Sequence, residues 1–194
     1  MFKAQRRTVV TVAAVAVVIV AAALVVTLTS GNGQASDRTY IGGGTSAWLY
    51  KPGHRPAAPS FSGTTLTGSK LKSSSYAGKA LVLNFWGSWC GPCRGEAPTL
   101  AVLSQKYGKD KVSFLGDDVG DTPTNAQTFA KSMGITYPSL NDPGYQTAQD
   151  FGKAVLINDT PTTVVIDSTD HIAGVIYGAA TYGELDTMLK KVSS

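Results

Sequence analysis

Unbroken hydrophobic runs and helical patterns of hydrophobic positions alternate along the second half of the chain. The segment ALVLNFWG at 80–87 is apolar almost throughout, which predicts a central strand buried on both faces. Leu66 and Leu71 flank a turn at 67–70 and predict a short hairpin before it. Three later strands are predicted at 111–119, 162–167 and 171–178, the last two as an antiparallel hairpin.

Hydrophobic positions at helical spacing predict four helices between and after these strands. Thr122 and Pro123 are a typical cap and first residue of the second helix, and Gly134 is a typical stop. Such alternation, followed by a hairpin and a last helix, predicts an α/β fold with a mixed central sheet and helices on both faces. The four helices cover 92–107, 122–134, about 143–151 and 181–192.

The chain begins with three basic residues and a long uncharged apolar run at 8–30. At 1.5 Å per residue this run would span about 34 Å as a helix, enough for a bilayer core of about 30 Å. Residues 1–30 therefore predict a signal anchor, with the basic flank in the cytoplasm and the rest of the chain outside. Cleavage after Ala35 is the alternative and would release a secreted protein.

Residues 31–58 are rich in glycine and proline and predict a linker ahead of a folded domain at 59–194. Two apolar stretches interrupt this composition, at Tyr40–Ile41 and at Trp48–Tyr50. We expect each to form a short strand or to cover a sheet edge.

Charge gives no sign of a nucleic-acid partner. Three of the 17 basic residues precede the apolar run, and all 13 acidic residues follow it, so the remainder of the chain is nearly neutral. Asp117, Asp118 and Asp121 lie close together in sequence, but their spacing differs from that of an EF-hand loop. We expect loop and helix-capping roles for these three residues.

The only two cysteines, Cys90 and Cys93, lie in NFWGSWCGPCRGEAP. Zinc sites typically need four ligands, and His54 and His171 are far apart in sequence, so no metal is expected. Haem attachment needs a histidine directly after the second cysteine, where Arg94 stands. A structural disulfide is a poor alternative, because a four-residue loop removes about 2 kcal/mol of chain entropy against about 3 for fifteen residues.

A redox role explains the position of the pair better. Cys90 lies where a predicted strand passes into a predicted helix, and free N–H groups and the helix dipole stabilise a thiolate there. The thiolate is the form that attacks a disulfide. Cys93, one turn further on, would be shielded and close enough to resolve a mixed disulfide. Pro92 suits the first turn because it needs no hydrogen-bond acceptor.

The segment FWGSWCGPC with Pro98 after it resembles thioredoxin. The likeness includes Trp86 and Trp89 before the first cysteine and Gly91 and Pro92 between the two. We expect Trp86 to pack beneath the pair and Trp89, Gly91 and Pro92 to shape the surface that docks a substrate.

Residues 59–194 as a whole resemble the thioredoxin fold, with one addition. Two predicted helices with SLND between them lie where thioredoxin has a single helix. With the N-terminal anchor, this αβ insertion is similar to the TlpA/ResA-type thiol–disulfide reductases. The resemblance also implies a cis peptide bond at Pro161 opposite the cysteines, and backbone hydrogen bonds from Thr160 to a bound peptide.

Two positions near the cysteines set the chain apart from thioredoxin itself. Thioredoxins usually carry a buried aspartate six residues before the first cysteine, where this chain has Asn84, which cannot titrate. Glu96 lies three residues after Cys93 and is the acid that ResA-like proteins use near the pair. A partly buried Glu96 would have a raised pKa and could exchange protons with Cys93. An ordinary solvated helix glutamate is the alternative.

The resemblance implies a membrane-anchored reductase that acts outside the cytoplasm without a cofactor. Cys90 would attack a substrate disulfide, and Cys93 would release the reduced substrate. It further implies a CcdA/DsbD-type membrane electron donor and apocytochrome c as a substrate. Three alternatives remain: a disulfide oxidase or isomerase, a non-catalytic binding module, and a peroxiredoxin, for which Gly87 occupies the place of the needed Thr or Ser.

Overall fold

The computed structural model describes residues 37–42, 46–108 and 111–193. The predicted anchor at 1–30 lies outside these ranges. Within them, no helix is both long and apolar enough to cross a bilayer.

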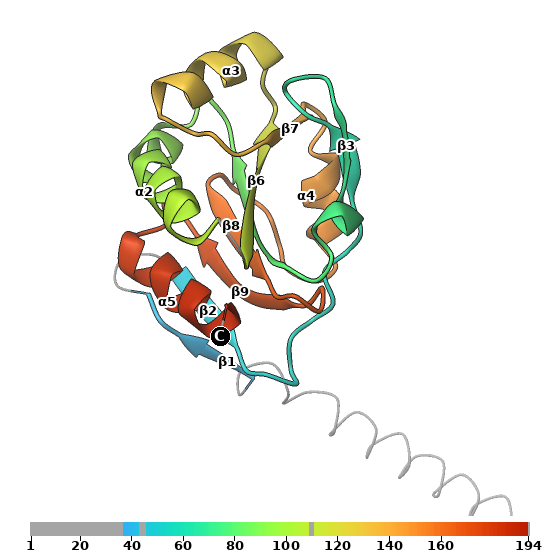
Figure 1. The fold of residues 1–194 in the computed structure, drawn as a ribbon, viewed down its shortest axis with the longest axis vertical. Helices are drawn as coiled ribbons and strands as arrows, with labels where there is room; N and C mark the ends of the chain where they lie inside the picture. The colour runs from blue at the N-terminus through green and yellow to red at the C-terminus, as the bar shows by residue number, and fades with distance from the viewer. Residues whose placement is uncertain (1–36, 43–45, 109–110, 194) are drawn as a thin grey trace, which may run out of the picture. The chain divides into compact units, whose positions relative to one another are not determined.

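A seven-stranded mixed sheet forms the centre of the fold, in the order β1-β2-β9-β8-β5-β6-β7 (Figure 1). The central strand β5 pairs in parallel with β6 and antiparallel with β8. A separate two-stranded hairpin, β3–β4, bridges to β7 through Thr65 and Leu140. The strands are β1 (Arg38–Tyr40), β2 (Ser46–Tyr50), β3 (Ser62–Thr64), β4 (Lys70–Lys72), β5 (Ala80–Trp86), β6 (Val112–Val119), β7 (Ser139–Asp142), β8 (Thr162–Ile166) and β9 (Ile172–Tyr177).

Helices cover both faces of the sheet, as predicted. One face packs against α2 and α5 through a core that includes Leu103, Leu185 and Met188. The other face packs against α4 through Phe151 and Ala148. The helices are α2 (Gly91–Tyr107), α3 (Pro123–Ser132), α4 (Gln146–Phe151) and α5 (Tyr182–Val192), with a 3-10 turn η1 (Ser73–Tyr76).

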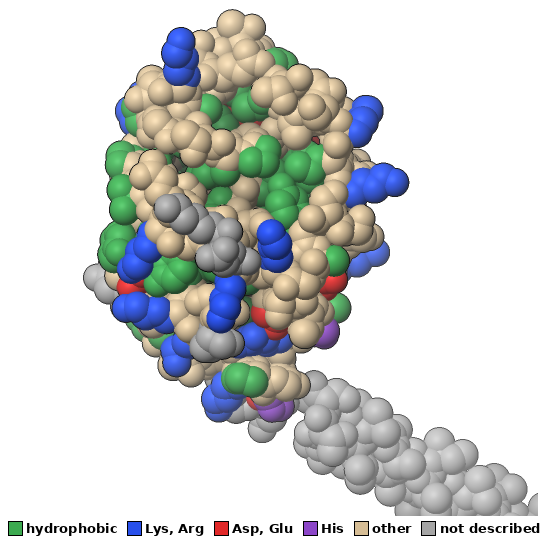
Figure 2. Space-filling view, in the orientation of Figure 1, with side chains coloured by type: hydrophobic (Ala, Val, Ile, Leu, Met, Phe, Trp, Pro, Cys, Tyr) green, Lys and Arg blue, Asp and Glu red, His purple; other side chains and the backbone are tan. Residues whose placement is uncertain are grey.

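Figure 2 shows the same view as a surface. Hydrophobic side chains lie in a hollow below α3. Lysine and arginine side chains lie around this hollow and toward the lower part of the face shown.

The helices and strands predicted from the first hairpin onward are confirmed, including two inserted helices, α3 and α4, between β6 and β8; the SLND segment between them forms strand β7, which was not predicted as a strand. Thr122 caps α3 by accepting a hydrogen bond from the Asn125 N–H, and Pro123 is the first residue of that helix. The hairpin β3–β4 turns through Thr65, whose N–H donates to the Ser69 carbonyl.

The short strands expected at Tyr40–Ile41 and Trp48–Tyr50 are present as β1 and β2, but the linker predicted around them at 31–58 requires a correction. Strand β2 lies inside it and pairs antiparallel with β9, where Ala47 faces Ile176 and is fully buried. Further along, the Ala58 N–H donates to the Asp170 carbonyl, and Arg55 forms an ion pair of 2.8 Å with Asp167. The sheet therefore begins before residue 59. The physical reason is the edge of β9, whose backbone groups need a partner that the apolar run at 47–50 supplies.

The topology of the central strands places the functional region at one end of the sheet. Strands β5 and β6 run in parallel and end together, whereas β8 runs the opposite way and begins where β5 ends. Phe85 accordingly faces Thr162. Cys90 lies in the segment that follows β5, and Pro161 lies in the segment that precedes β8. Both segments therefore lie at the same end of the sheet.

Candidate active site

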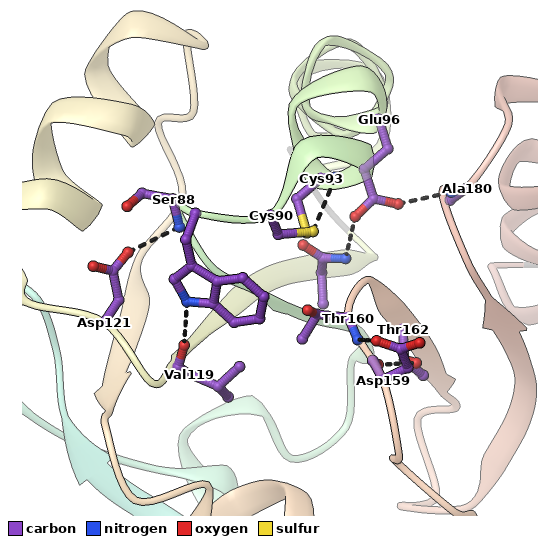
Figure 3. Close-up of a disulfide and its surroundings, with 12 residues drawn as sticks. Ser88, Cys90, Cys93, Glu96, Val119, Asp121, Asp159, Thr160, Thr162 and Ala180 are labelled. Atoms are coloured by element: carbon purple, nitrogen blue, oxygen red, sulfur yellow. Dashed lines mark hydrogen bonds between the residues drawn. A yellow bond between two sulfur atoms is a disulfide. The ribbon is translucent and has the colours of Figure 1, made fainter.

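Cys90 and Cys93 form a disulfide at the start of α2 (Figure 3). Cys90 is the residue that caps the helix, and its Sγ accepts a hydrogen bond of 3.2 Å from the Cys93 N–H. Pro92 occupies the first turn, where a missing N–H removes no helical hydrogen bond. In the reduced protein the same N–H and the helix dipole would stabilise a Cys90 thiolate.

Both sulfur-bearing residues are buried in this oxidised form. Cys90 is 4% exposed and Cys93 is 2% exposed, whereas Gly91 and Pro92 between them are exposed. In this form the exposed part of the motif between the cysteines is therefore the turn at residues 91–92.

The two tryptophans of the motif have different environments. Trp86 is buried beside both cysteines and stacks on Phe129 of α3, with 4.9 Å between ring centroids. Trp89 is 56% exposed, although its indole N–H donates to the Val119 carbonyl at 3.2 Å. The structure thus places Trp86 in the core behind the disulfide and fixes Trp89 on the surface next to it.

The Thr160–Pro161 peptide bond is cis, as the resemblance implied. Pro161 is buried at the start of β8, and its carbonyl accepts a hydrogen bond from the Gly178 N–H. The Thr160 N–H donates at 2.9 Å to Oδ1 of Asp159, the preceding residue. A peptide that used this N–H would have to displace the Asp159 carboxylate, which sequence reasoning had not anticipated.

Glu96 is held deep inside the protein, one turn beyond Cys93 on α2, and is only 1% exposed. Its Oε1 accepts a hydrogen bond of 2.8 Å from the Asn84 side-chain amide, and its Oε2 accepts one of 2.7 Å from the Ala180 N–H (Figure 3). The Asn84 amide also donates to the Thr163 hydroxyl at 3.0 Å. Asn84 is therefore the group on β5 that orients the carboxyl of Glu96.

The surroundings of Glu96 favour its neutral form. Burial raises the pKa of Glu96 to about 7, although the hydrogen bonds from Ala180 and Asn84 act in the opposite direction. Both of these donors are uncharged. A carboxyl with this pKa gains and loses a proton near neutral pH, which a proton partner of a thiol requires.

Some residues around Glu96 could not be found from the sequence. Ala180 contributes only its backbone N–H, from the loop between β9 and α5. Tyr137 lies near the carboxyl, and its pKa is raised by burial and by the charge of Glu96. Neither residue carries a sequence signal, whereas the unusual Asn84 ahead of the motif was a usable one.

The acidic residues after β5 correct another expectation. Asp121 does have the predicted loop role, since it accepts hydrogen bonds from the backbone N–H groups of Ser88 and Thr122. Asp117 and Asp118 instead lie within β6 and are fully buried. Burial, followed by the charge of Asp121, raises the pKa of Asp118 to about 7. The difference arises because β6 continues through both residues before the turn begins.

The fold and this site together define a thiol–disulfide oxidoreductase of the thioredoxin type. A family model described as the AhpC/TSA family matches residues 55–175. The chain belongs to this thioredoxin-like family, and its relatives place it among the thiol–disulfide oxidoreductases of the ResA and HelX type.

Three comparisons support this assignment. The chain is 33% identical over 135 residues to the thiol-disulfide oxidoreductase ResA of Geobacillus thermodenitrificans, which covers 70% of this chain and 75% of that protein. It is 39% identical over 116 residues to the thiol:disulfide interchange protein HelX of Rhodobacter capsulatus, with coverage of 59% and 60%. The crystal structure of a DsbF homologue from Corynebacterium diphtheriae has a TM-score of 0.71 at 34% identity, over 79% of this chain and 98% of that one.

Proposed function

We propose that this protein reduces disulfides in proteins outside the cytoplasm, with Cys90 as nucleophile and Cys93 as resolving thiol. The observation that carries the proposal is the redox pair at the start of α2 with a buried carboxyl, Glu96, one turn away. A structural disulfide requires no proton acceptor, whereas Cys93 must lose a proton before it attacks the mixed disulfide, and a buried carboxyl one turn away can accept it.

The reaction begins from the reduced pair. The Cys90 thiolate attacks one sulfur of the substrate disulfide, a new S–S bond forms, and the other substrate sulfur leaves as a thiolate that takes up a proton. Cys93 then loses its proton and attacks Cys90 of the mixed disulfide, which releases the second substrate thiol. In total, the pair gives two electrons to the substrate, which takes up two protons, equivalent to the one lost by Cys93 and one from solvent, and the Cys90–Cys93 disulfide remains.

Glu96 is the proposed acceptor of the Cys93 proton. Both groups lie on α2 one turn apart, both are buried, and a pKa of about 7 lets the carboxylate form accept a proton near neutral pH. Asn84 and the Ala180 N–H hold the carboxyl in place through this change.

Trp89, Gly91, Pro92, Thr160 and Pro161 are proposed to form the surface that docks the substrate. Gly91 and Pro92 are exposed over the disulfide, and Trp89 is fixed next to it. Thr160 and Pro161 lead into β8 at the same end of the sheet as the disulfide.

The proposed location and partners rest on the sequence before residue 31. Residues 8–30 would anchor the protein in the membrane with its oxidoreductase domain outside, unless cleavage after Ala35 releases it. A domain outside the cytoplasm needs reducing equivalents from across the membrane, so we propose a donor of the CcdA/DsbD type. Apocytochrome c, with its paired haem-attachment cysteines, is the proposed substrate.

Trapping the mixed disulfide tests this function. With Cys93→Ala in the native host, Cys90 can attack but the covalent intermediate cannot resolve, so disulfide-linked partners should accumulate. The matched control is Cys90→Ser with Cys93 intact, which should trap none. Cytochrome c precursors on the trap would support the proposed substrate, and an empty trap would contradict the function itself.

The redox potential tests the direction of the reaction. The Gly91–Pro92 dipeptide is that of thioredoxin, for which the potential is about −270 mV, against about −120 mV for the oxidant DsbA. We expect a value near the thioredoxin end, measured by equilibration with glutathione or dithiothreitol buffers. A value above about −150 mV would instead assign the protein as an oxidase.

A further inference from the structure

A small pocket opens beside the disulfide, between the loop that carries Trp89 and the segment that leads into α4. Phe85 of β5 and Ala148 of α4 line it, and Tyr145 stands just ahead of α4. Its volume is about 120 Å³, well below the roughly 300–1,000 Å³ of sites for small-molecule ligands. The pocket therefore has the size for one amino-acid side chain rather than for a cofactor.

Two of the three aromatic residues that line the pocket, Trp89 and Tyr145, are exposed yet held in place. Trp89 is 56% and Tyr145 is 41% exposed, and the Trp89 indole is tied to the Val119 carbonyl. Tyr145 has a left-handed backbone with φ 58°, which is uncommon for a bulky residue and concentrates at functional sites. Its ring lies against Gly120, where a side chain would collide with it. Fixed, exposed aromatic side chains are typical of binding surfaces.

Two residues that line the pocket directly precede residues of the reacting centre. Trp89 directly precedes Cys90, and Thr160 directly precedes the cis bond to Pro161; both line the pocket. Val119 and Thr160 lie on either side of this region, below the disulfide in Figure 3. A peptide whose half-cystine reaches Cys90 would thus bring a neighbouring side chain to this opening.

The lining also indicates which side chain fits. Six of the nine described residues that line it are apolar or aromatic, the three polar ones lie together at 158–160, and Asp159 is the one charged residue among them. An acidic side chain would be repelled by Asp159 and desolvated by the aromatic walls, whereas a long aliphatic one would bury its surface.

We propose that this pocket is a subsite for one large apolar side chain of the protein substrate, adjacent to the half-cystine that Cys90 attacks. The inserted segment with Tyr145 and Ala148 supplies the selectivity. This inference rests on the proposed reductase function and adds to it a preference that thiol chemistry alone does not give.

Matched peptide disulfides test the preference directly. Each peptide carries one cysteine as its glutathione disulfide, and the residue before or after that cysteine is leucine, alanine or glutamate. The full-length protein, pre-reduced, is mixed with each peptide, and the second-order rate constant of reduction is followed by chromatography. We expect leucine to exceed alanine by about 10-fold on one side of the cysteine, with glutamate slowest. Leucine and alanine within twofold of each other at both positions would overturn the proposal.

Two variants connect the preference to the pocket. Ala148→Leu fills the cavity from α4, and Tyr145→Ala removes its outer wall; each should bring the leucine-to-alanine ratio close to one. Tyr182→Ala is the matched control, because Tyr182 is 43% exposed at the start of α5, and the ratio should persist there. A ratio that both pocket variants leave at the wild-type value would overturn the assignment of the pocket even if Ala148→Leu alone folded poorly.

Failure of the subsite and failure of the function give different results. If the protein reduces all peptides at equal rates, the subsite is wrong and the reductase function stands. If it reduces none of them, while dithiothreitol does, the proposed function itself is contradicted.

Discussion

Two carboxyl groups lie near opposite ends of α2, and their environments push their pKa values in opposite directions. Asp186 of α5 meets the last turn of the helix, where it accepts hydrogen bonds from Lys106 at 2.7 Å and Tyr107 at 2.7 Å and pairs with Lys190 at 2.8 Å. The two lysines, Lys106 first, hold the pKa of Asp186 well below its ordinary range. Glu96, near the first turn, has only neutral donors, and burial raises its pKa to about 7.

The difference between the surroundings of Asp186 and Glu96 separates a structural role for a carboxyl group from a chemical one. At the C-terminal end of α2, two lysines keep Asp186 ionised, as in an ion pair that stabilises the fold. At the disulfide, the residues that the structure describes supply neutral hydrogen-bond donors that orient Glu96, and no cation among them pairs with its carboxyl group. A carboxyl that is oriented and free to titrate is suited to proton transfer, and a carboxyl with a fixed charge is suited to stability.

Introducing a second acid beside Glu96 should have the largest effect. Asn84→Asp places two carboxyls within hydrogen-bond distance in the core, where they can share one proton but cannot both ionise cheaply. We expect the oxidised variant to unfold like the wild type at pH 5 and to lose about 4 kcal/mol of unfolding free energy at pH 8, measured by urea denaturation.

Asn84→Ala is the control for that variant. It removes the amide donor without adding a charge, so any loss of stability should depend far less on pH. An Asn84→Asp loss of equal size at pH 5 and pH 8 would show that shape, and not charge, limits this position.

Removing the charge of Glu96 should have the next largest effect. A folded pKa of about 7 against an ordinary 4.5 means that the native state binds more protons than the unfolded state between these pH values. Glu96 therefore contributes about 3 kcal/mol to the free energy of unfolding below pH 4.5. This contribution is lost as the pH rises through 7.

Glu96→Gln should remove that part of the pH dependence. Urea unfolding of the oxidised proteins at pH 5 and pH 8 gives the comparison, and Asp118, whose pKa is also raised to about 7, contributes equally to both proteins. Curves with the same slope against pH in wild type and variant would contradict the pKa assigned to Glu96.

Removing a cation at the C-terminal end of α2 should have the smallest effect on stability. Lys106→Met removes one of the two cations from Asp186, but Lys106 is exposed and Lys190 remains. We expect the midpoint of thermal unfolding to fall by less than about 2 °C, and the difference to vanish in 1 M salt. A larger, salt-independent decrease would mean that this pair stabilises the fold as a buried network does.

Much of the fold could be predicted from the sequence, because its local patterns agree with its tertiary structure. The buried strand β5, the Thr122–Pro123 start of α3 and the closing helix all follow from periodicity and capping. A short strand was expected at Trp48–Tyr50, but it was placed in a linker because glycine and proline dominate its surroundings. Its pairing with β9 is a long-range contact that no local pattern encodes.

The site, too, contains residues that the sequence pattern predicts and residues that only the fold brings together. Cys90, Cys93 and Glu96 lie within seven residues of one helix start, so motif and helical spacing place them together. The Ala180 N–H that binds Glu96 and the Asp159 carboxylate that occupies the Thr160 N–H come from distant loops. Backbone donors in loops carry no side-chain signature, and only the fold brings them to the site.

A direct titration of Glu96 tests the central claim that the carboxyl beside the disulfide changes protonation near neutral pH. The glutamate side-chain carboxyl carbon can be followed by ¹³C NMR in the oxidised full-length protein, with Glu96→Gln identifying the resonance. We predict a midpoint near pH 7. A midpoint near the ordinary 4.5 would show that Glu96 is ionised throughout the neutral range and would contradict its role as proton partner of Cys93.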